Sequence, residues 1–67
     1  MKESEYYNLL SEIYEERHNR INEVYYSYSR GEINNSEKES QIRKIDHVAK
    51  EKIIHLEKEY YFSNKTY

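Results

Sequence analysis

Apolar residues recur at helical spacing through the first half of the chain. Between about residues 2 and 30 they step by three and four positions, the period of a helix that packs against a neighbour. The alternation that marks a β-strand does not persist over this length. The pattern therefore predicts a first helix over about 2–30. Its stripe consists of Tyr7, Leu10, Tyr14, Arg17 as the one polar member, Ile21, Val24 and Tyr28, with Tyr6 and Ile13 beside it.

A second stripe of the same period predicts a second helix over about 36–62. Val48, Ile54 and Tyr61 lie off this stripe, so the second helix has more than one apolar side. Residues 63–67 are mostly polar, and we expect them to fray. The stripe itself consists of Ile42, Ile45, Ala49, Ile53, Leu56 and Tyr60.

The segment 31–36 is the credible break between the two helices. Gly31 is the only glycine and proline is absent, so the left-handed residue that often ends a helix is favoured at one place. Asn34 with Glu37 has the form of a capping box, and Ser36 with Glu39 offers a second register. We therefore predict one domain over 1–67, a helical hairpin with its turn at 31–36.

Folding at this turn pairs positions whose numbers sum to about 67. Leu10 then faces Leu56, and apolar residues meet in every layer except the middle one. There Arg17 faces Ala49, the smallest residue of the second stripe. This agreement favours a two-helix antiparallel hairpin of the all-α class over one continuous helix.

The small size of the chain predicts that the hairpin associates. A chain of 67 residues has little apolar surface for a core, and no cysteine is present to form a disulfide. Helical hairpins of this kind commonly pair into bundles. We therefore expect a homodimer that forms a four-helix bundle.

The composition argues against several classes of protein. A net charge of −2 gives no strong one-sided field for binding nucleic acid. The start of the chain lacks the apolar stretch of a signal peptide, and no apolar run is long enough to cross a bilayer. Catalytic constellations and glycine-rich phosphate loops are not recognisable. We expect a soluble, cytoplasmic, non-enzymatic protein without a cofactor.

Tyrosine is the unusual feature of the composition, with nine residues against one phenylalanine. Its ring offers a large contact area with a polar end, which suits either the wet margins of a thin bundle or a surface that binds a partner. On the second interpretation, the predicted interaction surface consists of Tyr7, Tyr14, Arg17, His18, Tyr25, Tyr28, Ile54 and Tyr61.

Arg17 lies at a stripe position near the middle of its helix and admits three interpretations. Its stem can be buried while the guanidinium reaches solvent. It can instead bond a carboxylate of a second hairpin and fix the register of the dimer. The third interpretation is an anionic ligand, such as a phosphate.

Histidine and glutamate alternate at intervals of four in the second helix, at His47, Glu51, His55 and Glu59. Neighbouring members of such a series can share a metal ion. The series winds around the helix, however, so all four cannot meet at one ion. We expect a solvated polar face and no metal site.

These observations favour a protein-interaction module. The abundance of Ile, Lys, Asn, Glu and Tyr is typical of AT-rich coding, which suggests a small phage or mobile-element product that binds and modulates a host protein. In size and layout the chain resembles the plasmid RNA-binding regulator Rop, a hairpin that dimerises, which implies an RNA regulator as one alternative. The other alternative is a helical oligomer that binds a nucleotide between aromatic side chains and Arg17.

Overall fold

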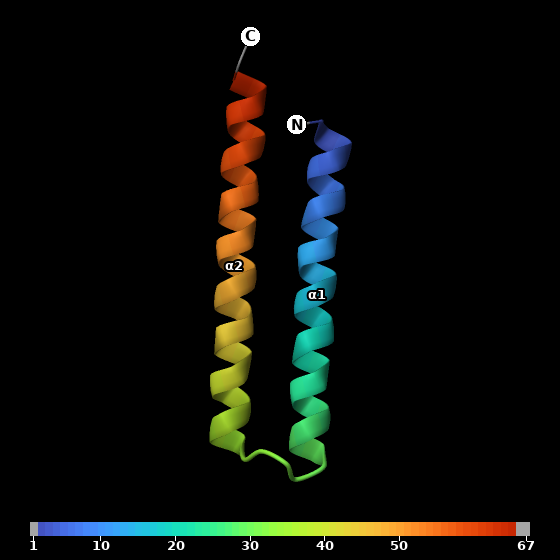
Figure 1. Ribbon diagram of the computed structural model, residues 1–67, viewed down its shortest axis with the longest axis vertical. Helices are drawn as coiled ribbons and strands as arrows, with labels where there is room; N and C mark the ends of the chain where they lie inside the picture. Colours follow the sequence, from blue (N-terminus) through green and yellow to red (C-terminus); the bar gives the residue numbers. More distant parts are fainter. Residues whose placement is uncertain (1, 66–67) are drawn as a thin grey trace.

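The computed structural model describes residues 2–65, and of residues 63–65 only the backbone. Helix α1 (Glu3–Ser29) and helix α2 (Asn35–Lys65) lie antiparallel, side by side, so that both ends of the chain are at the same end of the molecule (Figure 1). The predicted all-helical hairpin is confirmed. The predicted tail is helical as far as Lys65, since neither glycine nor proline interrupts it, and residues 66 and 67 lie outside the described residues.

The end of α1 is a Schellman motif built around Gly31. This glycine has a φ of 75°, its N–H donates to the carbonyl of Tyr28 at 3.0 Å, and the N–H of Glu32 donates to that of Ser27 at 3.0 Å. No atom lies within 4 Å of the place that a Cβ would take. The left-handed backbone, and not lack of space, therefore requires glycine here.

Helix α2 begins with the predicted capping box, in the first of its two possible registers. The Glu37 N–H donates to Oδ1 of Asn34 at 2.8 Å, and the Asn34 N–H donates to Oε1 of Glu37 at 3.1 Å. Each side chain thus satisfies a backbone donor that the helix leaves unpaired. The turn is defined on both sides by local hydrogen bonds.

A narrow apolar seam joins the two helices. Val24, Ala49 and Leu56 are the buried hydrophobic residues among those described, each less than a tenth exposed. Where the helices end, Tyr6 stacks on Tyr60 with ring centroids 4.3 Å apart, in agreement with the predicted pairing. The half-buried apolar residues of the seam are Tyr6, Leu10, Ile13, Ile21, Ile42, Ile45, Ile53 and Tyr60.

The stripe predicted for the first helix is partly wrong. Tyr7 and Tyr14 are 55% and 52% exposed, while their neighbours Tyr6 and Ile13 face α2. Successive helical residues are rotated by about 100°, so only one of two adjacent apolar residues can face the partner helix. The spacing of three and four fits either choice.

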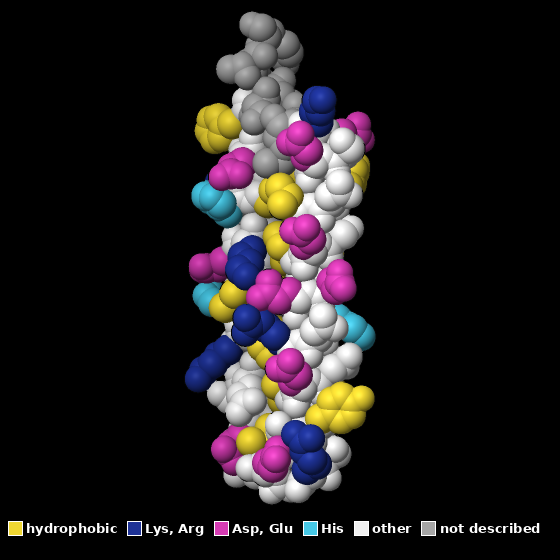
Figure 2. Space-filling model, turned by 45° about the vertical axis from the view of Figure 1, so that its right-hand side comes forward, with side chains coloured by type: hydrophobic (Ala, Val, Ile, Leu, Met, Phe, Trp, Pro, Cys, Tyr) yellow, Lys and Arg dark blue, Asp and Glu magenta, His cyan; other side chains and the backbone are white. Residues whose placement is uncertain are grey.

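The hairpin is long and thin, with Cα extents of 55 × 17 × 8 Å. Its accessible surface is 5484 Å², whereas a typical folded monomer of 8.3 kDa exposes roughly 4,600 Å². Hydrophobic side chains form a broken line along the middle of the face in Figure 2, with charged side chains beside them. About 900 Å² per chain is thus exposed beyond what a compact protein of this mass shows.

Candidate interaction surfaces

Two long faces flank the seam on opposite sides. Two residues along a helix amount to about 200° of rotation, so Tyr14 and Glu16 lie on nearly opposite sides of α1. We call the side with Tyr14 the tyrosine face, and define it on α1 as Tyr7, Tyr14, Ile21, Tyr25 and Tyr28. We call the other side the groove face, and define it as Leu9, Ile13, Glu16, Arg20, Lys44, Ile45, Val48 and Lys52, which line two adjoining grooves.

The tyrosine face is a regular row of large side chains. Four of its members, Tyr7, Tyr14, Ile21 and Tyr28, are seven residues apart and therefore lie in line along the helix. The tyrosines are between 40% and 55% exposed, although α2 lies alongside. Such a row in line with the axis has the form of a second seam, parallel to the one that α2 occupies.

Lys38 of α2 reaches over the turn end of this row. Its Nζ lies 4.4 Å from the ring centroid of Tyr28 and 5.5 Å from that of Tyr25. Both distances are within the range of a cation–π interaction. The ammonium group thus helps to hold the two rings in place at the surface.

A cluster of four aromatic rings closes the other end. Tyr6 and Tyr60 stack at the centre, Tyr7 packs edge-on against Tyr6 at 5.3 Å, and Tyr61 packs edge-on against Tyr60 at 5.8 Å. Burial by these neighbours, and next the negative charge of Glu57, raise the pKa of the Tyr6 phenol above its usual value. Tyr61 remains 60% exposed and extends the tyrosine face onto α2.

Arg17 is paired within its own chain. Its Nε donates to Oδ1 of Asp46 on α2 at 2.6 Å, and the two side chains are 40% and 46% exposed. The acceptor of the guanidinium is therefore a carboxylate of the same chain. It is neither solvent alone nor a carboxylate of a second hairpin. The sequence analysis placed Ala49 opposite Arg17 and so missed this contact.

His18 and Ile54 complete the predicted set. His18 is exposed, and its Nε2 lies 3.2 Å from the side-chain amide nitrogen of Asn22. Ile54 is 42% exposed, lies on a different side of α2 from Leu56, and is seven residues before Tyr61, on the same side of the helix as that tyrosine. Four of the eight predicted residues are members of the tyrosine face as defined on α1, and the sequence prediction left out Ile21 and Lys38.

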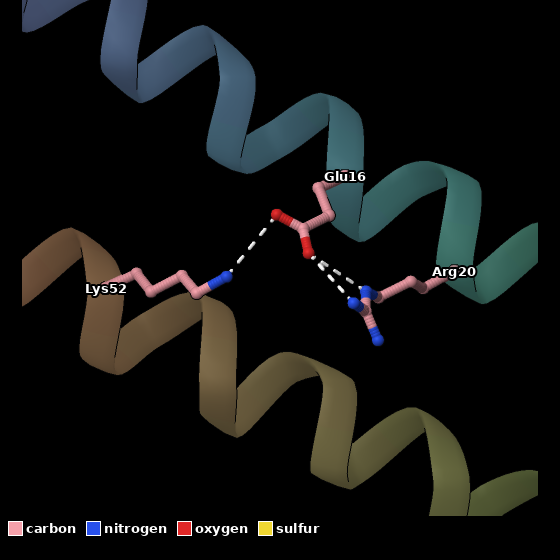
Figure 3. Close-up of polar contacts among 3 residues, drawn as sticks. All are labelled: Glu16, Arg20 and Lys52. Atoms are coloured by element: carbon pink, nitrogen blue, oxygen red, sulfur yellow. Dashed lines mark hydrogen bonds and ion pairs between the residues drawn. The ribbon is translucent and has the colours of Figure 1, made fainter.

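The groove face has an apolar floor beneath an ion network. Ile13, Ile45, Val48 and Ala49 line a groove of about 200 Å³. Glu16 crosses it, with one carboxylate oxygen 3.0 Å from Arg20 Nη2 and the other 3.4 Å from Lys52 Nζ (Figure 3).

The ion network has an electrostatic consequence for Glu16. The hydrogen bond from Lys52, the positive charge of that lysine, and then Arg20 lower the pKa of the Glu16 carboxyl from its ordinary 4.5. At the first of the two grooves Arg20, Lys44 and Lys52 outnumber Glu16, whereas the adjoining groove adds the carboxylates of Glu12 and Glu59.

The histidines of α2 pair with glutamates one turn later. His47 Nε2 lies 3.2 Å from Glu51, and His55 Nε2 lies 3.0 Å from Glu59. Within the described part of the chain, no three potential metal-ligating carboxylates or histidines come together. These contacts are exposed helix-surface pairs.

Neither helix has, within residues 2–65, an apolar stretch that is long enough to cross a membrane. Compared with known proteins, the chain matches no family model, and no curated protein or solved structure matches it.

Proposed function

We propose that this protein is a small non-enzymatic interaction module, which acts as a homodimeric four-helix bundle and binds a protein partner. The observation that carries the proposal is the large accessible surface of the hairpin, polar and apolar together, which includes exposed apolar side chains on both sides of the seam. The excess of about 900 Å² per chain is close to the roughly 800 Å² that each partner contributes to a standard interface. Association would bury this excess surface, which supports the proposal that the long, thin hairpin acts together with another chain.

The groove face supports the binding of an amphipathic, acidic segment of a partner. Its floor accepts apolar side chains from a helix laid along it. The surplus of cations at the rim favours carboxylates at the edges of that helix. The partner chemistry that fits the groove is thus a helix with one apolar side and acidic flanks.

The setting that we propose is the cytoplasm of a host cell, where the partner is modulated by this contact. The composition, rich in Ile, Lys, Asn, Glu and Tyr, supports an origin in a phage or mobile element. The lack of cysteine is compatible with a reducing compartment.

Two matched variants on α2 test the partner site. Val48 lines the groove and is 52% exposed, whereas Ile54 is 42% exposed and lies outside it. We expect a partner captured from host extract to be retained by Ile54→Asp and lost by Val48→Asp, because only the second places a like charge against the acidic helix. Equal capture by the two variants, or none by the natural chain, contradicts the proposed site.

The two alternative functions receive less support from the geometry. A nucleotide phosphate would have to displace Asp46 from Arg17, and tyrosine does not line the groove where Arg17 lies. An RNA regulator needs a basic stripe, but the lysines of α2 alternate with acidic residues. Thermal shifts with a nucleotide panel and RNA retardation at low salt test these functions directly.

A further inference from the structure

We infer that the two adjoining grooves together bind one partner helix whose charge reverses along its length. This helix is acidic over the first groove, nearer the turn, and basic over the adjoining groove, nearer the ends of the chain. The inference rests on the proposed function and deepens it, since it confines the acidic flanks of the partner helix to one half. The charges along the groove face, the length of its floor and its hollow shape carry the inference.

Positive charge remains at the first groove after its internal ion pairs are counted. The charged side chains that line it are Glu16, Arg17, Arg20, Lys44 and Lys52. Asp46 neutralises Arg17 at 2.6 Å. Glu16 bridges Arg20 and Lys52, and its single charge can neutralise only one of them. With Glu16 assigned to Lys52, the charges of Arg20 and Lys44 remain at this end of the groove face.

Negative charge remains at the adjoining groove after the same pairs are counted. The charged or titratable side chains that line it are Glu12, Glu16, Lys52, His55 and Glu59. Glu16 and Lys52 cancel here as well, because they line both grooves. With His55 counted as neutral, the charges of Glu12 and Glu59 remain. The groove face therefore has a positive and a negative end.

The two ends are far enough apart to act on a bound helix separately. Arg20 and Glu12 are separated by about 12 Å along α1, and Lys44 and Glu59 by about 22 Å along α2. Both separations exceed the roughly 8 Å over which physiological salt screens charges. A uniformly acidic helix would be attracted at one end and repelled at the other. The longer separation corresponds to a bound helix of about 15 residues.

The hollow shape of the face favours a single helix over a second copy. Ile13, Ile45 and Ala49 line the first groove, and Leu9 and Leu56 line the adjoining one. The side chains of one helix form a ridge that enters such a hollow. A second copy would place its own hollow over this one and leave the two apolar floors apart.

Three synthetic helical peptides of about 18 residues with the same leucine stripe test the charge order. In the segregated peptide, glutamate is confined to one half and lysine to the other. In the mixed peptide, the same residues are distributed along the whole length, and in the acidic peptide every charged residue is glutamate. We expect the segregated peptide to bind at least about fivefold more tightly than the others in fluorescence anisotropy, because it alone places opposite charge at both grooves.

A nitroxide label on the segregated peptide tests its orientation on the groove face. A label at the acidic end should broaden the amide signals of Ile45 and Val48 in nuclear magnetic resonance spectra. A label at the basic end should broaden those of His55 and Leu56 instead, since these residues line the adjoining groove. The reverse pattern overturns the inference.

Charge reversals in the protein are the matched tests. Lys44→Glu and Glu59→Lys each change the charge of one groove, so each should weaken binding of the segregated peptide about fivefold. Glu59→Lys should also strengthen binding of the acidic peptide, a result that loss of folding cannot produce. Lys50→Glu and Glu51→Lys are the controls, because they make the same charge changes on α2 at residues that line neither groove. Glu51, like Glu59, pairs with a histidine one turn earlier.

The outcomes separate this inference from the proposed function. Tightest binding of the acidic peptide, equal binding of all three, or binding of none overturns the inference, while capture with Val48→Asp still decides the proposed function. If Lys44→Glu and Glu59→Lys weaken self-association in sedimentation equilibrium and a mixture of the two restores it, a second copy occupies the grooves and the inference is wrong. Preference for the segregated peptide, lost in these two variants and kept in their controls, supports the inference.

Discussion

The two faces of the hairpin flank one seam, yet they differ in chemistry. The tyrosine face presents a row of rings along α1. The groove face has smaller aliphatic side chains below a network in which Glu16 joins Arg20 and Lys52. The proposed function assigns a different contact to each face: a face of aromatic rings suits a self-complementary partner, and a charged rim over a groove suits a selective one.

The proposed difference between the two faces is tested most directly by placing a carboxylate on each face, at two positions of equal exposure. Tyr14 and Val48 are each 52% exposed, so the two sites differ in face and not in burial. Tyr14→Glu should weaken self-association by a factor of about a hundred, since the dimer would have to desolvate an unpaired charge. Val48→Glu should change the dissociation constant by less than about twofold. Sedimentation equilibrium measures both, and equal effects would show that the faces do not divide their roles.

A smaller effect is expected from the ion pairs that cross the seam. Asp46→Asn should lower the free energy of unfolding by about 1 kcal/mol, because the bond from Arg17 is short and charge-assisted but partly solvated. Lys52→Met should have a smaller effect, since its nitrogen lies 3.4 Å from Glu16 at an exposed site. Urea titration at one protein concentration compares them, with Arg17→Met and the double variant to complete a cycle for the Arg17–Asp46 pair. A larger loss of unfolding free energy in Lys52→Met than in Asp46→Asn contradicts this order.

The smallest expected effect is a pH dependence confined to the groove face. The pKa of Glu16 is lower in the folded chain than its ordinary 4.5, so its ion pairs stabilise the fold above that pH. This stabilisation is lost as the pH falls through the folded pKa. Between pH 5 and pH 3 the urea midpoint of the natural chain should therefore fall more than that of Glu16→Gln. If the urea midpoints of the two proteins fall equally between pH 5 and pH 3, the ion pairs of Glu16 do not stabilise the fold.

The sequence predicted the parts of the fold that depend on local chemistry and period. Gly31 and the Asn34–Glu37 pair specify the turn through backbone hydrogen bonds, which depend only on neighbouring residues. The pairing of the helices followed from the turn, and the stack of Tyr6 on Tyr60 agrees with it.

The rotation of α1 against α2 and the acceptor of Arg17 could not be predicted from the spacing of the apolar residues alone. Tyr6 and Tyr7 both fit steps of three and four, and the choice between them depends on how the helix is rotated against α2. The pairing of Arg17 with Asp46 could not be predicted from the period, because Asp46 is not part of the apolar stripe of the second helix. A signal was available, because Asp46 lies one turn from Ala49, the residue predicted to face Arg17.

The capped turn also has a consequence for the order in which the hairpin assembles. Contacts between the helices next to the turn close a short loop of chain, whereas the stack of Tyr6 on Tyr60 closes nearly the whole of it. The entropy lost on closure grows with loop length, so the helices are expected to zip from the Gly31 end towards the ring cluster. Amide exchange should accordingly be faster towards that cluster than in the turns around Val24 and Ala49, two of the three buried side chains among the described residues.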